Sequence, residues 1–315
     1  MTVLLTGSSG FIGSELFKKI KKTTMPIKVL RQPFFSKLYN LPKKKIFVLN
    51  NVNQNKRLSK LFSGISTIIH CAAIKSNISK NYKDFKKVNA EYTINLAKQA
   101  AFYNVKRFIF LSSISVNGNN NVNFKLFKYN DTPKPESFYA ISKLEAEEAL
   151  LEISKQTGLE VVIIRPPLVY GKKIGGNFLS LLNLIYKQIP LPILNIKYPR
   201  AYIGIDNLVD IIISCINRPN LSGKILLVSD GEDISLVDLV KKLSKFLKKP
   251  LILFSVPNWL FRLIVSLIYK KDNYLKFFSS AKVDISYTRK ILQWSPKFTM
   301  DMQLKKMVNW YLKNQ

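Results

Sequence analysis

The sequence predicts an α/β fold in which a doubly wound parallel sheet is followed by a smaller mixed domain. Three observations predict it. Short apolar runs alternate with helical patterns through the first half of the chain, a glycine-rich turn joins the first run to the first helical pattern, and the alternation gives way to an irregular pattern after Pro166 and Pro167. Strands that are apolar throughout are buried on both faces, as in a parallel sheet covered by helices.

The expected elements follow in order from the N-terminus. Residues 3–6, VLLT, predict a short buried strand, and residues 11–22 predict a helix with its apolar side chains on one face. Residues 28–30 and 45–49 are two further expected strands. Residues 66–73 are a fourth, because this run is continuous and apolar.

Later segments continue the alternation and then change character. A helix is expected at 84–104 and a fifth strand at 105–116. Another helix is expected at 137–157, and the segment 159–171 begins as a sixth strand. Further on, residues 234–248 are helix-like, and residues 259–270 are amphipathic but too short to span a membrane.

We expect two domains, residues 1–165 and residues 166–315. A segment at about 200–230 is expected to return to the first domain. The sequence contains no internal repeat and no low-complexity linker, so the second domain should pack directly on the first.

The composition is strongly basic, with a formal net charge of +31. The lysine pairs are scattered and do not form one block with aromatic residues, so we attribute them to composition bias and expect no specific nucleic-acid surface. A positive field would still attract a phosphate-bearing substrate. Cys71 and Cys215 are the only cysteines and no apolar run is long enough to span a bilayer, so a cytoplasmic protein without a disulfide framework is expected.

The glycine-rich turn predicts a phosphate-binding site. Gly7, Gly10 and Gly13 follow a strand and open a helix, where free helix N–H groups point toward an anion. Gly7 is expected to make the turn, Gly10 to let a pyrophosphate approach the backbone, and Gly13 to let helix and strand touch. At the start of a βαβ run, this turn predicts a Rossmann-type dinucleotide site.

The turn and five later segments resemble the extended short-chain dehydrogenases/reductases, the group of nucleotide-sugar epimerases and dehydratases. TGSSGFIG resembles their TGxxGxxG, and HCAA at 70–73 resembles their H-x-A-A. The other segments occur in the family's order: FLSSISVNG (110–118), YAISK (139–143), RPPLVYG (165–171) and YIGIDNLVD (202–210). The chain looks most like UDP-sugar 4-epimerases and 4-keto-reductases of surface-polysaccharide synthesis. The resemblance implies an NAD(P)-binding first domain, a nucleotide-sugar-binding second domain and a homodimer.

Tyr139 and Lys143 are four residues apart, so on a helix they share one face. A sugar hydroxyl must lose a proton as its carbon gives up hydride, and a free tyrosine, with a pKa of about 10, is a poor base at neutral pH. A nearby ammonium is expected to lower that pKa by about one to three units. The resemblance implies that Ser113 hydrogen-bonds the reacting oxygen, that Tyr139 is the acid/base, and that Lys143 lowers the tyrosine pKa and holds the nicotinamide ribose.

His70 is the only histidine and ends an apolar strand, so we expect a packed, hydrogen-bonded core residue. With one histidine and two separated cysteines, no metal site is expected. The dehydratases of the family carry Asp-Glu directly after the active-site Ser or Thr, whereas Ile114 and Ser115 follow Ser113 here. Elimination of water is therefore not expected, and hydride transfer at C4 of the sugar remains.

The end of the second expected strand bears on the choice of cofactor. NAD-specific relatives carry an acidic residue there, but no acidic residue occurs between Glu15 and Asp84, and Arg31 occupies the position. A guanidinium suits a 2′-phosphate, so the sequence favours NADP(H) and leaves NAD(H) open. The resemblance implies cofactor contacts at Gly7, Ser9, Gly10, Phe11, Ile12, Gly13, Arg31, Asn51, Val52, Cys71, Ala72, Ala73, Asn89, Leu111, Tyr139, Lys143, Pro166 and Leu168.

On the substrate side, the resemblance implies contacts at Lys75, Ser113, Asn177 and Arg200, with Asn177 and Arg200 on the nucleotide diphosphate. The predicted function is an NAD(P)-dependent 4-epimerase of UDP-glucose or a UDP-N-acetylhexosamine. Two alternatives stay open. One is an NADPH-dependent reductase of a UDP-4-keto-6-deoxyhexosamine, and the other is a non-catalytic, cofactor-sensing protein that binds nucleic acid.

Overall fold

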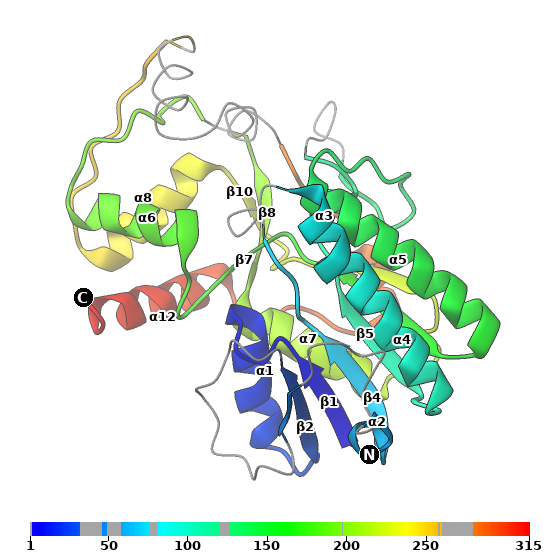
Figure 1. Ribbon diagram of the computed structural model, residues 1–315. Helices are drawn as coiled ribbons and strands as arrows, with labels where there is room; N and C mark the ends of the chain where they lie inside the picture. Colours follow the sequence, from blue (N-terminus) through cyan, green and yellow to red (C-terminus); the bar gives the residue numbers. More distant parts are fainter. Residues whose placement is uncertain are drawn as a thin grey trace.

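The computed structural model describes residues 2–31, 46–48, 58–75, 81–119, 126–196, 198–257, 259 and 280–315. Seven strands form one parallel sheet in the order β3-β2-β1-β4-β5-β6-β9 (Figure 1). They are β1 (Thr2–Thr6), β2 (Ile27–Arg31), β3 (Ile46–Val48), β4 (Ile65–His70), β5 (Arg107–Leu111), β6 (Glu160–Arg165) and β9 (Lys224–Leu227). The strand order reverses between β1 and β4, so the predicted doubly wound sheet is confirmed.

Helices cover both faces of this sheet because successive side chains of each strand point to opposite sides. In β1, Val3 and Leu5 belong to one core cluster and Leu4 to another. The first cluster includes side chains of α1 (Phe11–Lys21), α7 (Ile205–Asn217) and α11 (Ser286–Leu292). The second includes side chains of α2 (Leu58–Phe62), α4 (Tyr92–Phe102) and α5 (Phe138–Thr157).

A second, smaller sheet has the order β10-β8-β7. Its strands are β7 (Leu168–Tyr170), β8 (Arg200–Gly204) and β10 (Asp233–Ile234), of which β7 runs parallel and β10 antiparallel to β8. A third core cluster joins this sheet to α6 (Gly176–Tyr186), α8 (Leu236–Leu247) and α12 (Met300–Leu312). The predicted mixed C-terminal part is therefore present, and its described residues include regular helices and strands that the irregular sequence pattern after Pro166 does not reveal.

Two expectations about single elements need correction, and a third concerns residues that lie mostly outside the described chain. The helix expected at 84–104 is divided into α3 (Tyr82–Phe85), the π-helix η2 (Lys86–Glu91) and α4, a division that apolar spacing alone does not reveal. The strand expected at 105–116 ends at Leu111, because Ser113 caps the 3₁₀-helix η3 (Ile114–Val116) by accepting from the Ser115 nitrogen. The amphipathic segment 259–270 lies outside the described residues except for Trp259.

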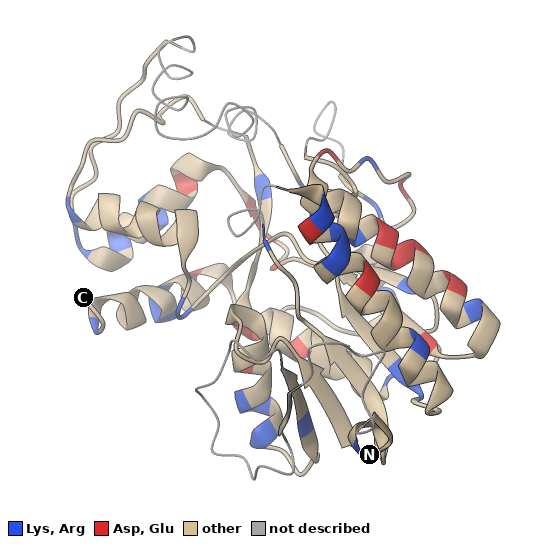
Figure 2. Cartoon of the chain, in the orientation of Figure 1, with Lys and Arg blue, Asp and Glu red and all other residues tan. Residues whose placement is uncertain are grey.

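Charged residues are distributed unevenly over the molecule. Figure 2 shows lysines and arginines scattered over many elements, whereas acidic residues gather along α5. This agrees with the scattered lysine pairs of the sequence. None of the helices in the described ranges combines the length and the apolar character that crossing a membrane requires.

A buried ion pair joins α5 to β6. The side chains of Glu147 and Arg165 are each only 2% exposed, and Arg165 Nε donates to the two carboxylate oxygens at 3.0 and 3.1 Å. Arg165 Nη1 donates to Asn117 Oδ1 at 2.9 Å, and the Ser112 hydroxyl donates to the Glu147 carboxylate. Every charge in this group has a partner, which offsets the cost of removing it from water.

We expect Arg165→Met to lower the free energy of unfolding by about 3–5 kcal/mol, because it leaves the Glu147 carboxylate buried without a cation. Urea denaturation followed by circular dichroism measures the change. Adding Glu147→Leu should restore part of the loss, since no buried charge then remains. As a control, Lys18→Ala removes a partly exposed pair with Glu15 and should cost less than about 1 kcal/mol. An equally small loss in Arg165→Met would contradict this account.

Candidate active site

The turn between β1 and α1 has a backbone that requires glycine. Gly7 has a φ of +67°, and a Cβ on it would lie 2.6 Å from the Ala72 nitrogen. A Cβ on Gly13 would lie 2.2 Å from the Gly7 oxygen, so helix and strand touch at this point. Gly10 is the N-cap of α1, makes no side-chain cap, and precedes a first turn without an acidic residue. A bare helix N-terminus of this kind fits the phosphates of a dinucleotide.

The segment after β4 lies beside this turn. Cys71 N donates to the Thr6 carbonyl at 3.4 Å, and Ala72 N donates to Thr6 Oγ1 at 3.3 Å, so both are held on the end of β1. Because β1 and β4 are the strands at which the order reverses, the crevice at their carboxyl ends is where such sheets bind ligands. The structure thus brings together the predicted contacts of the turn and those of Cys71, Ala72 and Ala73.

Asn89 lies behind this segment. It is fully buried, accepts from the Ile74 nitrogen at 2.9 Å, and donates to the Ile74 carbonyl at 3.1 Å and to Ser142 Oγ at 3.2 Å. These bonds hold the segment after β4 against α5. The structure therefore gives Asn89 a supporting position, and its predicted contact with the cofactor stays a prediction.

His70 is fully buried between two threonines. The Thr93 hydroxyl donates its one proton to the Asn89 carbonyl at 2.7 Å, so Thr93 Oγ1 accepts from His70 Nε2 at 2.9 Å. His70 Nδ1 then accepts from the Thr6 hydroxyl at 2.7 Å. These bonds assign the neutral Nε2–H tautomer, and burial lowers the pKa of His70 to about 3. The expected hydrogen-bonded core histidine is confirmed.

Ser113 and Tyr139 meet at the end of β5. Ser113 is the N-cap of η3, and Tyr139 lies in the first turn of α5, which Ser137 caps by accepting from the Ala140 nitrogen. Burial raises the pKa of Tyr139 to about 12, and the neighbouring Ser113 hydroxyl partly opposes this shift.

Lys143 lies one helical turn after Tyr139 and is 1% exposed. Its Nζ donates to the Leu111 carbonyl at 2.8 Å and lies 4.3 Å from the centre of the Phe110 ring. Burial lowers the pKa of Lys143 to about 8, while the carboxylate of Glu147 raises it. The ammonium is thus anchored on β5. Burial keeps the pKa of Tyr139 above its ordinary value, so the lowering of this pKa by Lys143 stays a prediction.

Some residues that position these groups are not among the predicted ones. The Ser115 hydroxyl donates to Ser113 Oγ at 2.9 Å, and Glu147 lies one turn after Lys143 on the same helix. The spacing of Lys143 and Glu147 is a signal that sequence analysis could have used, because residues four apart share a helix face. No sequence pattern predicts the role of Ser115, because its bond to Ser113 depends on the backbone of η3.

The predicted substrate contacts are more scattered. Lys75 is exposed after β4, Asn177 is exposed at the start of α6, and Arg200 is half-buried at the start of β8, where burial lowers the pKa of its guanidinium. No described contact joins these side chains to Tyr139, so their roles stay predictions. Across the described ranges, no group of three His, Cys, Asp or Glu residues could hold a metal ion.

The remaining predicted cofactor contacts lie around the same sheet edge or outside the described chain. Arg31 ends β2, and Asn51 and Val52 lie outside the described residues. The Pro166 carbonyl accepts from the Ile114 nitrogen at 2.9 Å, and Leu168 is exposed at the start of β7. The last three predicted cofactor contacts are close to the glycine turn: Ser9 lies within it, and Phe11 and Ile12 begin α1.

Comparison with known sequences agrees with the family resemblance of the motifs. Residues 3–228 match the sequence model of the NAD dependent epimerase/dehydratase family. The chain is 36% identical to a UDP-glucose 4-epimerase of Vibrio cholerae over 316 residues, which cover 99% of this chain and 95% of that protein.

Two solved structures share the fold. A UDP-glucose 4-epimerase of Thermotoga maritima, determined with UDP-glucose, has a TM-score of 0.80 and 21% identity, with 100% of this chain and 99% of that chain covered. A UDP-glucuronic acid 4-epimerase of Bacillus cereus, determined with NAD, has a TM-score of 0.78 and 22% identity, with 98% and 96% covered. At these identities the likeness establishes the fold alone.

The single histidine makes the pH dependence of stability a direct test of its environment. The pKa of folded His70, about 3, is lower than the ordinary value of about 6.5. Between pH 7 and pH 5 the unfolded chain therefore takes up a proton that the folded protein does not. The free energy of unfolding should fall by about 2 kcal/mol over this interval.

Urea denaturation at the two pH values measures this change. His70→Asn has no titrating side chain at position 70. In this variant the pH-dependent change in the free energy of unfolding should shrink to below about 0.5 kcal/mol, even though the variant is less stable at both pH values. An unchanged pH dependence in His70→Asn would show that other groups cause it.

Proposed function

The chain belongs to the NAD dependent epimerase/dehydratase family, and on that premise we propose that it is a 4-epimerase of a UDP-hexose that uses a nicotinamide cofactor. The observation that carries the proposal is the arrangement at the end of β5, where Ser113 follows the strand and caps η3, while Tyr139 and the anchored Lys143 share one face of α5. The 36% identity to a UDP-glucose 4-epimerase supports the same substrate class.

The proposed roles follow from these contacts. A bound oxidised nicotinamide supplies the hydride acceptor. Tyr139 Oη takes the proton of the C4 hydroxyl and later returns it to the C4 carbonyl oxygen, while the Ser113 hydroxyl holds that oxygen by a hydrogen bond. Lys143, fixed on the Leu111 carbonyl, stabilises the phenolate while it carries negative charge.

The cofactor and the substrate are proposed to occupy opposite sides of one cleft. The turn from Gly7 to Gly13 and the segment Cys71–Ala73 hold the cofactor, because both offer bare main chain at the reversal of strand order. Arg200 and Asn177 bind the diphosphate of the UDP-sugar. On this proposal residues 1–165, together with β9, form the cofactor domain, residues 166–315 supply the rest, and two copies form a dimer.

The local structure after Ser113 favours epimerisation over dehydration. Elimination of water needs an acid and a base beside neighbouring carbon atoms. In η3 the positions after Ser113 are Ile114 and Ser115, and Ser115 uses its hydroxyl to hold Ser113. No carboxyl group of η3 is present to remove a second proton.

A second candidate, a reductase of a UDP-4-keto sugar, is favoured by one observation. β2 ends at Arg31, a position where a cation suits the 2′-phosphate of NADP(H). A cofactor that must be exchanged after each turnover suits net reduction, whereas an epimerase regenerates its cofactor within each cycle.

The two candidates predict different products. With UDP-glucose or UDP-N-acetylglucosamine and a catalytic amount of cofactor, we expect the C4 epimers to interconvert without net loss of reduced cofactor. NMR of the anomeric protons measures this exchange. Tyr139→Phe should slow this exchange by about 10²–10⁴-fold, because it removes the proton carrier. Tyr103→Phe, which keeps its stacking on Phe62, is the control. Oxidation of one NADPH per keto sugar, with no epimer exchange, would establish the reductase instead.

The choice of cofactor is tested separately. We expect NADP to bind more tightly than NAD, and Arg31→Asp to reverse the preference by at least about tenfold, because a carboxylate repels the 2′-phosphate and accepts from a 2′-hydroxyl. Isothermal titration calorimetry measures both affinities. The control is Lys106→Asp, which precedes β5 and so lies at the amino ends of the strands, away from Arg31. If the unmodified protein prefers NAD, the NADP assignment is wrong.

A further inference from the structure

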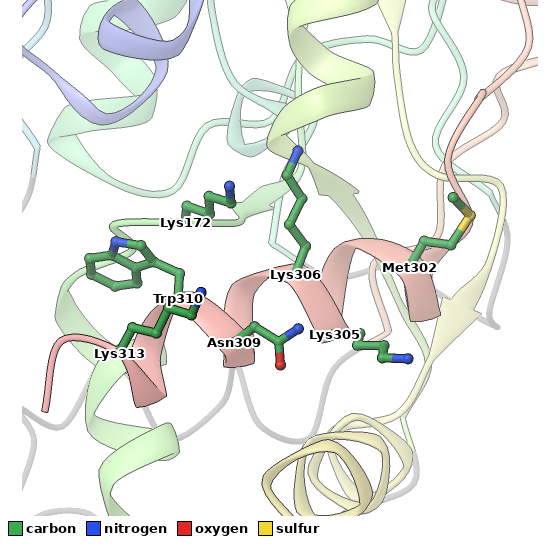
Figure 3. Close-up of a pocket in the computed structure, with 7 residues that line it drawn as sticks. All are labelled: Lys172, Met302, Lys305, Lys306, Asn309, Trp310 and Lys313. Carbon is green, nitrogen blue, oxygen red and sulfur yellow. The ribbon is translucent and has the colours of Figure 1, made fainter.

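A cavity of about 390 Å³ lies on α12, and none of its lining residues belongs to the candidate active site (Figure 3). Its size is within the range of small-molecule pockets. The lining residues are Lys172, Met302, Lys305, Lys306, Asn309, Trp310 and Lys313.

The helical period of α12 produces this surface. Its buried residues, among them Leu304, Met307 and Tyr311, pack in the third core cluster. Six lining residues recur at the complementary positions, so they form the opposite face. Lys172 comes from the segment after β7 and completes the pocket, as Figure 3 shows.

The pocket carries positive charge that the protein does not neutralise. Lys306 is paired with Asp206, with 2.5 Å between Nζ and Oδ2. Lys172, Lys305 and Lys313 form no salt bridge with any residue in the described ranges. No carboxylate lines the cavity. An anion of two or more charges would therefore meet ammonium groups that are not already paired.

The pocket also offers an aromatic face. Trp310 is half-buried and packs against the third core cluster, so its ring is held in place before a ligand arrives. Figure 3 shows it close to Lys172 and Lys313. Met302 adds an apolar side chain that is 56% exposed, and Asn309 adds an amide that can donate and accept. A tryptophan ring beside several lysines suits a base joined to phosphate groups.

We infer that this pocket binds a mononucleotide, with its phosphates on Lys172, Lys305 and Lys313 and its base against Trp310. A cavity of about 390 Å³ has room for one nucleotide. The inference is independent of the proposed function, because it uses none of the residues of the candidate active site. The same chemistry occurs in single-stranded nucleic acid, so the experiment must distinguish the two sources.

The test uses the full-length protein labelled with ¹³C in its methionine methyl groups. The chain has five methionines, and Met302→Leu identifies the Met302 signal. Titration with ADP or with UDP should shift the Met302 signal to saturation, while the buried Met307 stays in place as an internal control. UDP is also expected at the candidate active site, so the Met302 signal, and not total binding, is the readout. Adenosine, which lacks phosphate, should need at least about tenfold higher concentration.

Charge reversal supplies the matched control. Lys305→Glu/Lys313→Glu should weaken ADP binding, read from Met302, by at least about tenfold, whereas Lys60→Glu/Lys106→Glu, with the same change of net charge at exposed positions elsewhere, should leave it unchanged. Equal affinity in both double variants, or a Met302 signal that does not move, would overturn the inference. A thymidine oligonucleotide of about eight residues that shifts Met302 at lower concentration than ADP would overturn the mononucleotide assignment in favour of a nucleic-acid strand.

Discussion

The buried ion pair between Glu147 and Arg165 determines how α5 sits on the sheet, and the candidate active site depends on that placement. Arg165 ends β6 and Glu147 lies in the middle of α5, so the pair joins a strand to the helix that covers it. Lys143 and Tyr139 precede Glu147 by one and two helical turns and therefore share its face. Ser112, which donates to Glu147, is followed directly by Ser113, the N-cap of η3. The buried ion pair thus also positions the candidate catalytic residues.

The turn between β1 and α1 depends on its glycines. At Gly7 and Gly13 a Cβ would collide with neighbouring backbone, and the segment at Ala72 is bonded to the end of β1. The N-terminus of α1 has no side-chain cap and no acidic residue in its first turn, so it favours an anion. The turn therefore suits dinucleotide phosphates, while the titratable Tyr139 and Lys143 lie on α5.

A second polar centre attaches the smaller sheet. The Asp230 carboxylate accepts from the Tyr170 hydroxyl at 2.6 Å, from the Gly204 nitrogen at 3.0 and 3.1 Å, and from Asn207 Nδ2 at 2.7 Å. Burial raises the pKa of Asp230, and these hydrogen bonds lower it. Because Tyr170 is on β7, Gly204 on β8 and Asn207 on α7, one carboxylate links both strands to a helix that covers the large sheet.

The sequence by itself determined the order of the first six strands, the glycine turn, and the placing of Tyr139 and Lys143 on one helix. These features depend on residues close together in the chain, whose spacing sets periodicity and turn geometry. Only the tertiary structure decided that the pKa of Tyr139 is raised, that Asn89 supports the segment after β4, and that Lys172 joins α12 at a basic cavity. Each of these depends on contacts between residues far apart in the chain, and the spacing of residues along the sequence does not specify which distant residues meet.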